Sequence, residues 1–485
     1  MTKLVPTEQQ LNCIEMSKLH NAVRIEAVAG ASKTTTLTMI AAEIVKPSIY
    51  LAFNKATADE GRAKFPPHVN CQTTHSVAFS ECGKEIAHKL NRPKGHYVNV
   101  AGTGSEIAKM YKIQPIFDKD KCVVTSAAIG MFAKQSVARF EQSSDKEITL
   151  KHVVYNEHVK SLDILLIAKK LWKDRINPSK MVLATHDTYL KLYQISEPVL
   201  EYSVIYVDEF QDSTECVIDI VKRQQHAKVI IVGDSKQAIY QWRGSINGLS
   251  TYKAVECNLS KSFRFGTAIA DVAMKILKNK TIVLGSENIP SVVGDVDIAQ
   301  QHTMLFRTNS GLLEAAVDAI EAKMSVHIEI DTKDFTALLY SCLALEAMDT
   351  KNVKHEKVLP YADWEAFQQG CKEDAELKRM LNLVKSGKAL RSIALLEQYQ
   401  ETHKGDKDYH ILFTTAHKSK GREWDQVILS NDFPSHYKAS GEWVGLNEME
   451  ENLLYVAATR AKMCLQVNCS VVEALEYCKR ELLVK

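Results

Sequence analysis

Short apolar runs alternate with amphipathic segments along much of the chain. Runs rich in Val, Ile, Leu and aromatic residues have the length of buried strands. They lie at residues 23–28, 48–53, 204–207, 229–232, 409–414 and 427–430. After the first run, Leu37, Ile40, Ala41 and Ile44 recur with the helical period and predict one apolar helix face. Strands alternating with helices favour an α/β fold with parallel sheets, whose ligands bind at the carboxyl ends of the strands.

Two long stretches break this alternation, at residues 76–180 and 332–404. Neither contains the regular succession of apolar runs, and the second is rich in Leu, Ala, Glu and Lys. These residue types favour helices. We therefore expect two mainly helical insertions, each placed within an α/β domain.

Composition and charge limit the class of protein. The 485 residues are 45% hydrophobic, which suffices for more than one core, and 61 basic residues against 59 acidic ones give a net charge of +2. Any surface that binds nucleic acid must therefore be local.

No apolar run approaches the length of about 18 to 20 residues that spans a bilayer, and the N-terminus lacks the apolar core of a signal peptide. We expect a soluble, non-secreted protein. Its expected location is the nucleus or the cytoplasm, the latter in a prokaryote or in a virus-infected host. The eleven cysteines contain no CxxC pair, and we expect reduced thiols.

A candidate phosphate-binding loop follows the first predicted strand, with the sequence AVAGASKT at residues 27–34. In such loops backbone N–H groups at a helix N-terminus hold phosphate, a Lys reaches the β and γ phosphates, and a Thr hydroxyl binds Mg²⁺. Lys33 and Thr34 have the required spacing from Gly30. Ala27 and Ser32 replace the two glycines of the usual pattern, so an ordinary strand, turn and helix with a capping Ser remains an alternative.

A second strand supports the phosphate-binding interpretation. The run at residues 204–207 ends in Asp208 and Glu209. One carboxylate can hold Mg²⁺ while the other orients and deprotonates a water molecule. Phosphoryl transfer to water needs both functions. We predict that Asp208 binds the metal ion and that Glu209 accepts the proton of the water molecule.

Ordered sequence boxes extend this pattern over nearly the whole chain. They are DEFQD at 208–212, VGDSKQAIYQWRG at 232–244, LSKSFRF at 259–265, TAHKSKGREW at 415–424 and LYVAATRA at 454–461. Together with the phosphate loop, they resemble the superfamily 1 helicases of the UvrD, PcrA and Rep kind. SFRF at 262–265 and THDTYLK at 185–191 resemble the F-box DNA helicase branch, although no F-box-like segment precedes Gln10.

The resemblance implies two RecA-like P-loop NTPase domains with ATP between them. We expect the first domain at residues 1–75 and 181–250, with its insertion at 76–180. The second domain is expected at residues 251–331 and 405–485, with a reduced accessory insertion at 332–404.

The resemblance also assigns roles around ATP and Mg²⁺. It implies that Gln10 reads adenine, Phe263 stacks on it and Glu423 meets the ribose. The phosphate loop then comprises Ala29, Gly30, Ala31, Ser32, Lys33, Thr34 and Thr35, with Thr34 and Asp208 as metal ligands. The implied catalytic residues are Lys33, Glu209, the γ-phosphate sensor Gln237, and Arg264 and Arg460, which neutralise charge on the transferred group.

A single DNA strand is expected to run across both domains. Aromatic stacking holds single strands without sequence preference. The resemblance suggests the contacts Phe53, Asn54, Thr74, His75, Tyr240, Trp242 and Arg243, with Arg307 and His417 on the second domain. An alternative interpretation is that the Trp242 side chain packs over the edge of a domain instead of contacting DNA. His75 and His417 do not belong to a cluster spaced as metal ligands are.

We therefore expect an ATP-dependent DNA helicase, a hydrolase that moves 3′ to 5′ along single-stranded DNA as a monomer. Its expected substrates are single strands and junctions of single strand with duplex, and its expected settings are DNA repair, recombination or replication, with proteins of those processes as partners. Alternatives are a translocase that strips recombinase or other proteins with little unwinding, a nucleotide-gated scaffold without turnover, and an RNA helicase. Retention of Thr34, Asp208, Glu209, Gln237 and both arginines argues against the scaffold.

Overall fold

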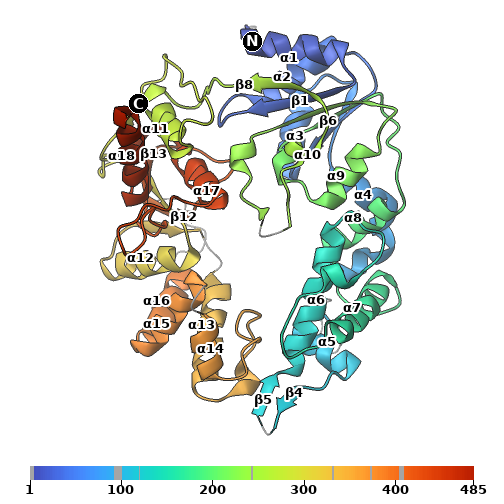
Figure 1. The fold of residues 1–485 in the computed structure, drawn as a ribbon, viewed down its shortest axis with the longest axis vertical. Helices are drawn as coiled ribbons and strands as arrows, with labels where there is room; N and C mark the ends of the chain where they lie inside the picture. Colours follow the sequence, from blue (N-terminus) through green and yellow to red (C-terminus); the bar gives the residue numbers. More distant parts are fainter. Residues whose placement is uncertain are drawn as a thin grey trace.

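The computed structural model describes residues 5–91, 101–119, 121–241, 244–329, 332–371, 374–402 and 409–484. Figure 1 shows two sheet-containing domains side by side, with a mainly helical arm descending from each. Trp242 and Arg243, expected to contact DNA, lie outside the described residues.

The first domain is built on a parallel sheet of six strands in the order β3-β2-β6-β7-β1-β8. Its strands are β1 (Ala22–Ala27), β2 (Ser48–Ala52), β3 (Val69–Thr73), β6 (Val204–Val207), β7 (Lys228–Gly233) and β8 (Val255–Leu259). Helices α1 (Glu8–Leu19), α2 (Lys33–Glu43), α3 (Lys55–Lys64), α4 (Thr74–Ala78), α8 (His186–Ile195), α9 (Glu215–Lys222) and α10 (Gly248–Thr251) connect and flank them. Because β6, β7 and β1 are neighbours, the segments that follow these three strands meet at one edge of the sheet.

The second domain is built on a parallel sheet in the order β11-β12-β10-β13-β14-β9. Its strands are β9 (Val292–Val293), β10 (His302–Phe306), β11 (Val326–Ile328), β12 (Ile411–Thr415), β13 (Trp424–Leu429) and β14 (Ala461–Gln466). Its helices are α11 (Thr267–Ile276), α12 (Asn309–Glu321), α17 (Glu448–Ala458) and α18 (Cys469–Val484). The fold class expected from the sequence, α/β with parallel sheets, is thus confirmed.

The two domains share one buried core. A continuous cluster of buried side chains includes Ile25 from β1, Phe265 from the segment before α11 and Tyr455 from α17, each fully or almost fully buried. Burial of this kind stabilises an interface through the apolar area removed from water. The contact between the domains is therefore held by packing as well as by the polar contacts described below.

The predicted apolar runs form β1, β2, β6, β7, β12 and β13, with small shifts of their ends. β12 begins at Ile411 rather than at residue 409, and β13 begins at Trp424, three residues earlier than expected. The apolar face predicted at Leu37, Ile40 and Ala41 is buried in α2.

The arms are mainly helical, as predicted. Residues 76–180 contain α5 (Gly104–Tyr111), α6 (Ser126–Gln142) and α7 (Ser161–Ile176), together with a hairpin of β4 (Ile116–Asp118) and β5 (Lys121–Val124). Residues 332–404 contain α13 (Thr332–Glu346), α14 (Trp364–Gly370), α15 (Ala375–Lys385) and α16 (Ala389–Thr402). The domain boundaries stay predictions. β8 pairs with β1, which favours ending the first domain after β8 rather than at residue 250.

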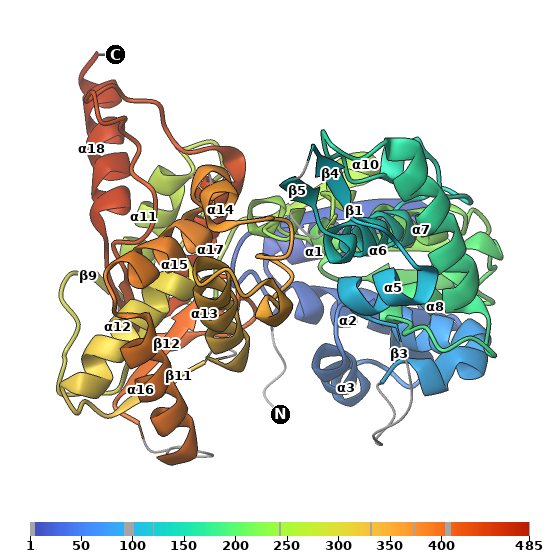
Figure 2. The same ribbon diagram turned by 90° about the horizontal axis from the view of Figure 1, so that it is seen from below.

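The helical arms approach each other below the two sheets. In Figure 2, viewed from below, α14 and the chain around it face the β4–β5 hairpin and the start of α6. In the described part of the chain, no helix has the length and apolar character needed to cross a bilayer.

Candidate active site and nucleic-acid interface

The turn after β1 has the backbone of a phosphate-binding loop. Gly30 has a φ of 75° and Ser32 a φ of 57°, both in the left-handed region, and α2 begins at Lys33. The Ala31 N–H donates to the Val28 carbonyl at 3.1 Å. Ser32 occupies the N-cap position, but its side chain makes no capping hydrogen bond. The capping role considered for Ser32 is therefore wrong, while phosphate binding by the loop stays a prediction.

Thr34 and Asp208, the expected metal ligands, lie together although Thr34 belongs to α2 and Asp208 follows β6. The Thr34 hydroxyl donates to Asp208 Oδ2 at 3.0 Å, and the Tyr50 hydroxyl donates to the same oxygen at 2.7 Å. Burial raises the pKa of Asp208, and the neighbouring Glu209 raises it further, against the opposing effect of Lys33. A hydroxyl and a buried carboxylate are hard oxygen donors, and this pair fits Mg²⁺, which keeps several water ligands in protein sites.

Glu209 lies beside the phosphate loop in a polar environment. Lys33 Nζ lies 3.0 Å from Glu209 Oε1, and Gln211 Nε2 donates to Glu209 Oε2 at 2.5 Å. Burial tends to raise the pKa of Glu209, but Lys33 and Lys420 outweigh it and hold the value at about 2. Glu209 is therefore ionised at neutral pH and able to accept a proton.

The segment after β7 links this centre to the second domain. Gln237 Nε2 donates to Asp234 Oδ2 at 2.8 Å, and a terminal nitrogen of Arg460 lies 3.5 Å from Gln237 Oε1. Arg460 is fully buried, and its Nε donates to the Val456 carbonyl at 2.8 Å. Burial lowers the pKa of Arg460, and the nearby Arg264 lowers it further. The two expected cationic residues of the second domain thus lie close to each other.

Arg264 and Phe263 lie next to the phosphate loop. The Phe263 N–H donates to the Gly30 carbonyl at 2.8 Å, and the Phe263 ring is 43% exposed. Arg264 Nε donates to Glu423 Oε2 at 2.6 Å. A Cβ added to Gly30 would come within 2.7 Å of Arg264 Cβ, so only glycine permits this approach of the two domains.

Gln10 and Thr35 lie at the margins of the loop. Gln10 is buried in the capping box of α1 and donates from Nε2 to the Thr36 hydroxyl at 3.1 Å. The Thr35 carbonyl accepts from the Thr38 hydroxyl at 2.7 Å. Gln10 is thus attached to the helix that follows the phosphate loop, while Ala29 is contacted from the second domain.

Three residues of this centre carried no assigned role in the sequence. Tyr455 is fully buried, and its hydroxyl accepts from the Ala29 N–H at 2.9 Å and donates to Asp234 Oδ2 at 3.2 Å. Lys420 forms an ion pair with the buried Asp212 and donates to the Gln237 carbonyl. Tyr455 and Lys420 lie inside recognised boxes, which was the available signal, whereas Tyr50 lies within β2 and had none.

Several expected DNA contacts share a cavity of about 290 Å³ with the candidate metal ligand Asp208 and the candidate catalytic residue Glu209. Phe53, Thr74, His75 and Tyr240 line it together with Asp208, Glu209 and Asp212. The rings of Phe53 and Tyr240 are nearly parallel, at 9°, with centroids 6.3 Å apart. The structure thus places aromatic surfaces next to the candidate hydrolytic centre.

The remaining candidates are more dispersed. Asn54 caps α3 by accepting from the Thr57 N–H at 2.9 Å, and His75 Nε2 lies 3.3 Å from Asp187 Oδ1. The His417 carbonyl accepts from the Tyr240 hydroxyl at 3.3 Å, which connects the two domains. Arg307 forms a two-point ion pair with Glu450, so its guanidinium already has a protein partner.

Within the described ranges, no group of three or more His, Cys, Asp or Glu side chains is arranged to hold a metal ion. The expected Mg²⁺ position at Thr34 and Asp208 uses one hydroxyl and one carboxylate, so it is a different kind of site.

Comparisons with known proteins agree with the order of the boxes. The UvrD/REP helicase N-terminal domain family matches residues 7–254, and the UvrD-like helicase C-terminal domain family matches residues 361–471. F-box DNA helicase protein 1 of Schizosaccharomyces pombe is 28% identical over 97% of this chain and 58% of its own length. F-box DNA helicase 1 of Gallus gallus is 32% identical over 93% of this chain and 48% of its own length, so the chain spans about half the length of these relatives. Gabija protein GajB of Bacillus cereus is 24% identical over 59% of this chain and 68% of its own length. The chain belongs to the UvrD/REP helicase family.

Proposed function

We propose that this protein hydrolyses ATP in the cleft between its two α/β domains and uses the cycle to move 3′ to 5′ along single-stranded DNA and to unwind duplex. One observation carries the proposal. The segment from Asp234 to Tyr240 contacts Arg460 and Tyr455 at its beginning and lines the aromatic cavity with Tyr240 at its end. A change at the nucleotide is thereby connected to a change at the strand.

The residues of the cleft divide the work of phosphoryl transfer. Lys33 and the backbone of the phosphate loop bind the phosphates, and Thr34 and Asp208 hold Mg²⁺, which neutralises charge on the transferred group. Glu209 accepts the proton of the attacking water, since it is ionised at neutral pH. Arg264 and Arg460 approach from the second domain and add positive charge where the transition state develops negative charge.

Lys420 and Tyr240 connect this chemistry to the DNA cavity. Lys420 pairs with Asp212 and bonds the Gln237 carbonyl, while its Nζ lies 5.2 Å from the centre of the Tyr240 ring. Tyr240 in turn bonds the His417 carbonyl and faces Phe53. Closure of the cleft therefore moves the rings that offer stacking surfaces to bases, each worth about 1–3 kcal/mol.

ATPase measurements with and without single-stranded DNA test this proposal. We expect DNA to stimulate turnover, and Lys33→Ala to abolish it while DNA binding persists, because the lost ammonium group neutralises phosphate charge. A protein whose turnover is indifferent to DNA, or one in which Lys33→Ala retains the parent rate, contradicts the proposal. Displacement of a recombinase filament by the same preparation distinguishes protein stripping from unwinding.

A further inference from the structure

The Tyr50 hydroxyl is one of three hydrogen-bond donors that surround the Asp208 carboxylate in the described part of the chain. It donates to Asp208 Oδ2 at 2.7 Å, and the Thr34 hydroxyl donates to the same oxygen at 3.0 Å. The Glu209 N–H donates to the other oxygen, Asp208 Oδ1, at 2.9 Å. An ionised carboxylate has about four acceptor positions in total. Protein donors therefore leave about one of these positions for a metal ion or for a water molecule bound to it.

Close packing holds the Tyr50 side chain in place while it makes this contact. Tyr50 is fully buried in β2, which lies between β3 and β6 in the first sheet. Its ring stacks on Phe65, which follows α3, with 4.5 Å between the ring centroids. A Cβ added to Gly61 of α3 would come within 3.0 Å of Tyr50 Cε1. The ring thus has little room to move, and its hydroxyl keeps a fixed position relative to Asp208.

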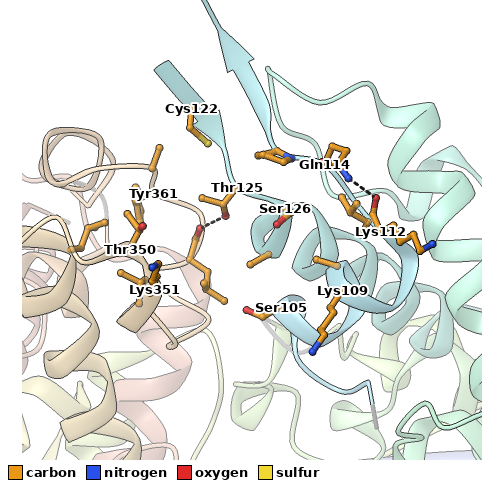
Figure 3. A pocket seen from close by; sticks show the side chains of 18 residues that line it. Ser105, Lys109, Lys112, Gln114, Cys122, Thr125, Ser126, Thr350, Lys351 and Tyr361 are labelled. Carbon is orange, nitrogen blue, oxygen red and sulfur yellow. Dashed lines mark hydrogen bonds between the residues drawn. The ribbon is translucent and has the colours of Figure 1, made fainter. Parts of the chain in front are cut away.

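The bond between Tyr50 and Asp208 is closed to solvent, unlike polar contacts between the two helical arms. In Figure 3 the Thr125 hydroxyl donates to the Leu359 carbonyl at 3.4 Å, beside a cavity of about 720 Å³. Exposed side chains such as Lys351 line that cavity, so a water molecule can replace a lost hydrogen bond there. Tyr50 is 0% exposed and Asp208 is 4% exposed. Loss of the Tyr50 hydroxyl therefore leaves a buried acceptor without that donor.

The number of free acceptor positions on Asp208 bears on the choice of metal ion. Mg²⁺ requires near-octahedral geometry, keeps several water ligands and uses few carboxylate oxygens. Ca²⁺ has a more flexible shell and also accepts both oxygens of one carboxylate. Because both oxygens of Asp208 already accept hydrogen bonds, the carboxylate can approach a metal ion in only one direction. This arrangement suits Mg²⁺ and disfavours binding of Ca²⁺ through both oxygens.

We propose that Tyr50 is a positioning residue of the metal site, which orients the Asp208 carboxylate for Mg²⁺ and thereby favours Mg²⁺ over Ca²⁺. The inference rests on the proposed function, in which Thr34 and Asp208 hold Mg²⁺. The Thr34 O–H donates to Asp208, so the lone pairs of that hydroxyl oxygen stay available to the metal ion. Tyr50 supplies no ligand of its own. It limits the directions in which Asp208 can bind, as hydrogen-bond partners of metal ligands do elsewhere.

Tyr50→Phe tests this role, because it removes the hydroxyl and keeps the ring. Binding of a fluorescent, non-hydrolysable ATP analogue is measured with EDTA, with Mg²⁺ and with Ca²⁺. We expect the affinity in EDTA to equal that of the parent protein, since the phosphate loop is unchanged. The gain in affinity from Mg²⁺ should fall about tenfold, at the lower end of the range for residues that hydrogen-bond a metal ligand. The gain from Ca²⁺ should fall less, because the released carboxylate oxygen can share in binding Ca²⁺.

Tyr206→Phe is the matched control. Tyr206 is the register partner of Tyr50 in the neighbouring strand β6 and is likewise fully buried. Within the described residues, its hydroxyl does not bond Asp208. The control variant should therefore keep the parent affinities under all three conditions. An equal loss of metal-dependent affinity in the two variants would overturn the inference, since it would reflect the loss of any tyrosine hydroxyl from this part of the sheet.

Gly61→Ala displaces the Tyr50 ring without removing its hydroxyl, so it should also lower the gain from Mg²⁺. A Tyr50 side chain that only fills space predicts a lowered melting temperature and an unchanged gain from Mg²⁺ in both variants. That result, or an equal loss with Mg²⁺ and Ca²⁺ in Tyr50→Phe, overturns the inference. If the parent protein binds the analogue without any gain from Mg²⁺, the metal site of the proposed function fails, and the inference fails with it.

Discussion

Ser32→Gly tests the cost of a side chain in the phosphate loop. Ser32 has φ 57° and ψ 44°, a left-handed conformation that costs an L-residue about 1–2 kcal/mol and glycine almost nothing. Its side chain makes no capping bond that would offset this cost. Glycine also has more conformational entropy than serine in the unfolded chain. This difference lowers the stability gained from relief of the strained backbone by about 0.4–1 kcal/mol. We therefore expect Ser32→Gly to stabilise the protein by up to about 1.5 kcal/mol.

The assay for this substitution combines thermal unfolding with nucleotide binding. A gain of about 1 kcal/mol should raise the melting temperature by about 2–4 °C in a domain of this size. ATP affinity should stay the same or increase, since a Cβ is removed where the backbone approaches phosphate. Lys112→Gly is the matched control, because Lys112 has φ 54° at the end of α5, away from the loop. A stabilised Lys112→Gly beside a Ser32→Gly that has lost stability or ATP affinity would refute the reasoning and indicate a contact made by the Ser32 hydroxyl.

Other substitutions test separate parts of the site. Glu209→Gln should bind ATP but hydrolyse it about 10²- to 10⁴-fold more slowly, because the amide accepts no proton, and a parent rate in single-turnover assays would place the base elsewhere. Trp242→Ala should weaken single-strand affinity about 5- to 150-fold through the loss of one stacked base, whereas unchanged anisotropy with a lowered melting temperature would indicate a packing role. Burial raises the pKa of Asp212 to about 6, against the opposing effect of Lys420, so the folded state binds this proton more tightly than the unfolded chain does. The corresponding stability is present at low pH and is lost as the pH rises from about 4 to 6. In Asp212→Asn, the urea midpoint of unfolding should therefore fall less between about pH 4 and 6 than in the parent protein. An equal fall of the midpoint in both proteins would contradict this prediction.

In the first sheet, three strands that the sequence revealed differ physically from the two that it did not. β2, β6 and β7 lie inside the first sheet and are buried along almost their whole length, so they form continuous apolar runs. β3 and β8 are the edge strands of that sheet, and each alternates buried with more exposed positions while carrying Asn, Gln or Glu. Five residues with mixed polarity do not stand out against loops, which explains why both were missed.

The same distinction applies to the candidate site. Lys33, Thr34, Asp208 and Glu209 were identified because their function depends on short local spacings that follow a strand. Gln142, the last residue of α6, lines the 290 Å³ cavity and lies against Gly244, about a hundred residues later, so its place depends on contacts made only after folding. No local pattern encodes such a contact, and the sequence therefore gave no indication of it.

Strand displacement on substrates with a single-stranded tail of defined polarity tests the central claim most directly. We predict that the protein unwinds a duplex with a 3′ tail when ATP and Mg²⁺ are present, and that Glu209→Gln fails to do so although it binds the same substrate. Unwinding that needs no ATP hydrolysis, that requires a 5′ tail, or that is absent from a protein with DNA-stimulated ATPase activity would contradict the account.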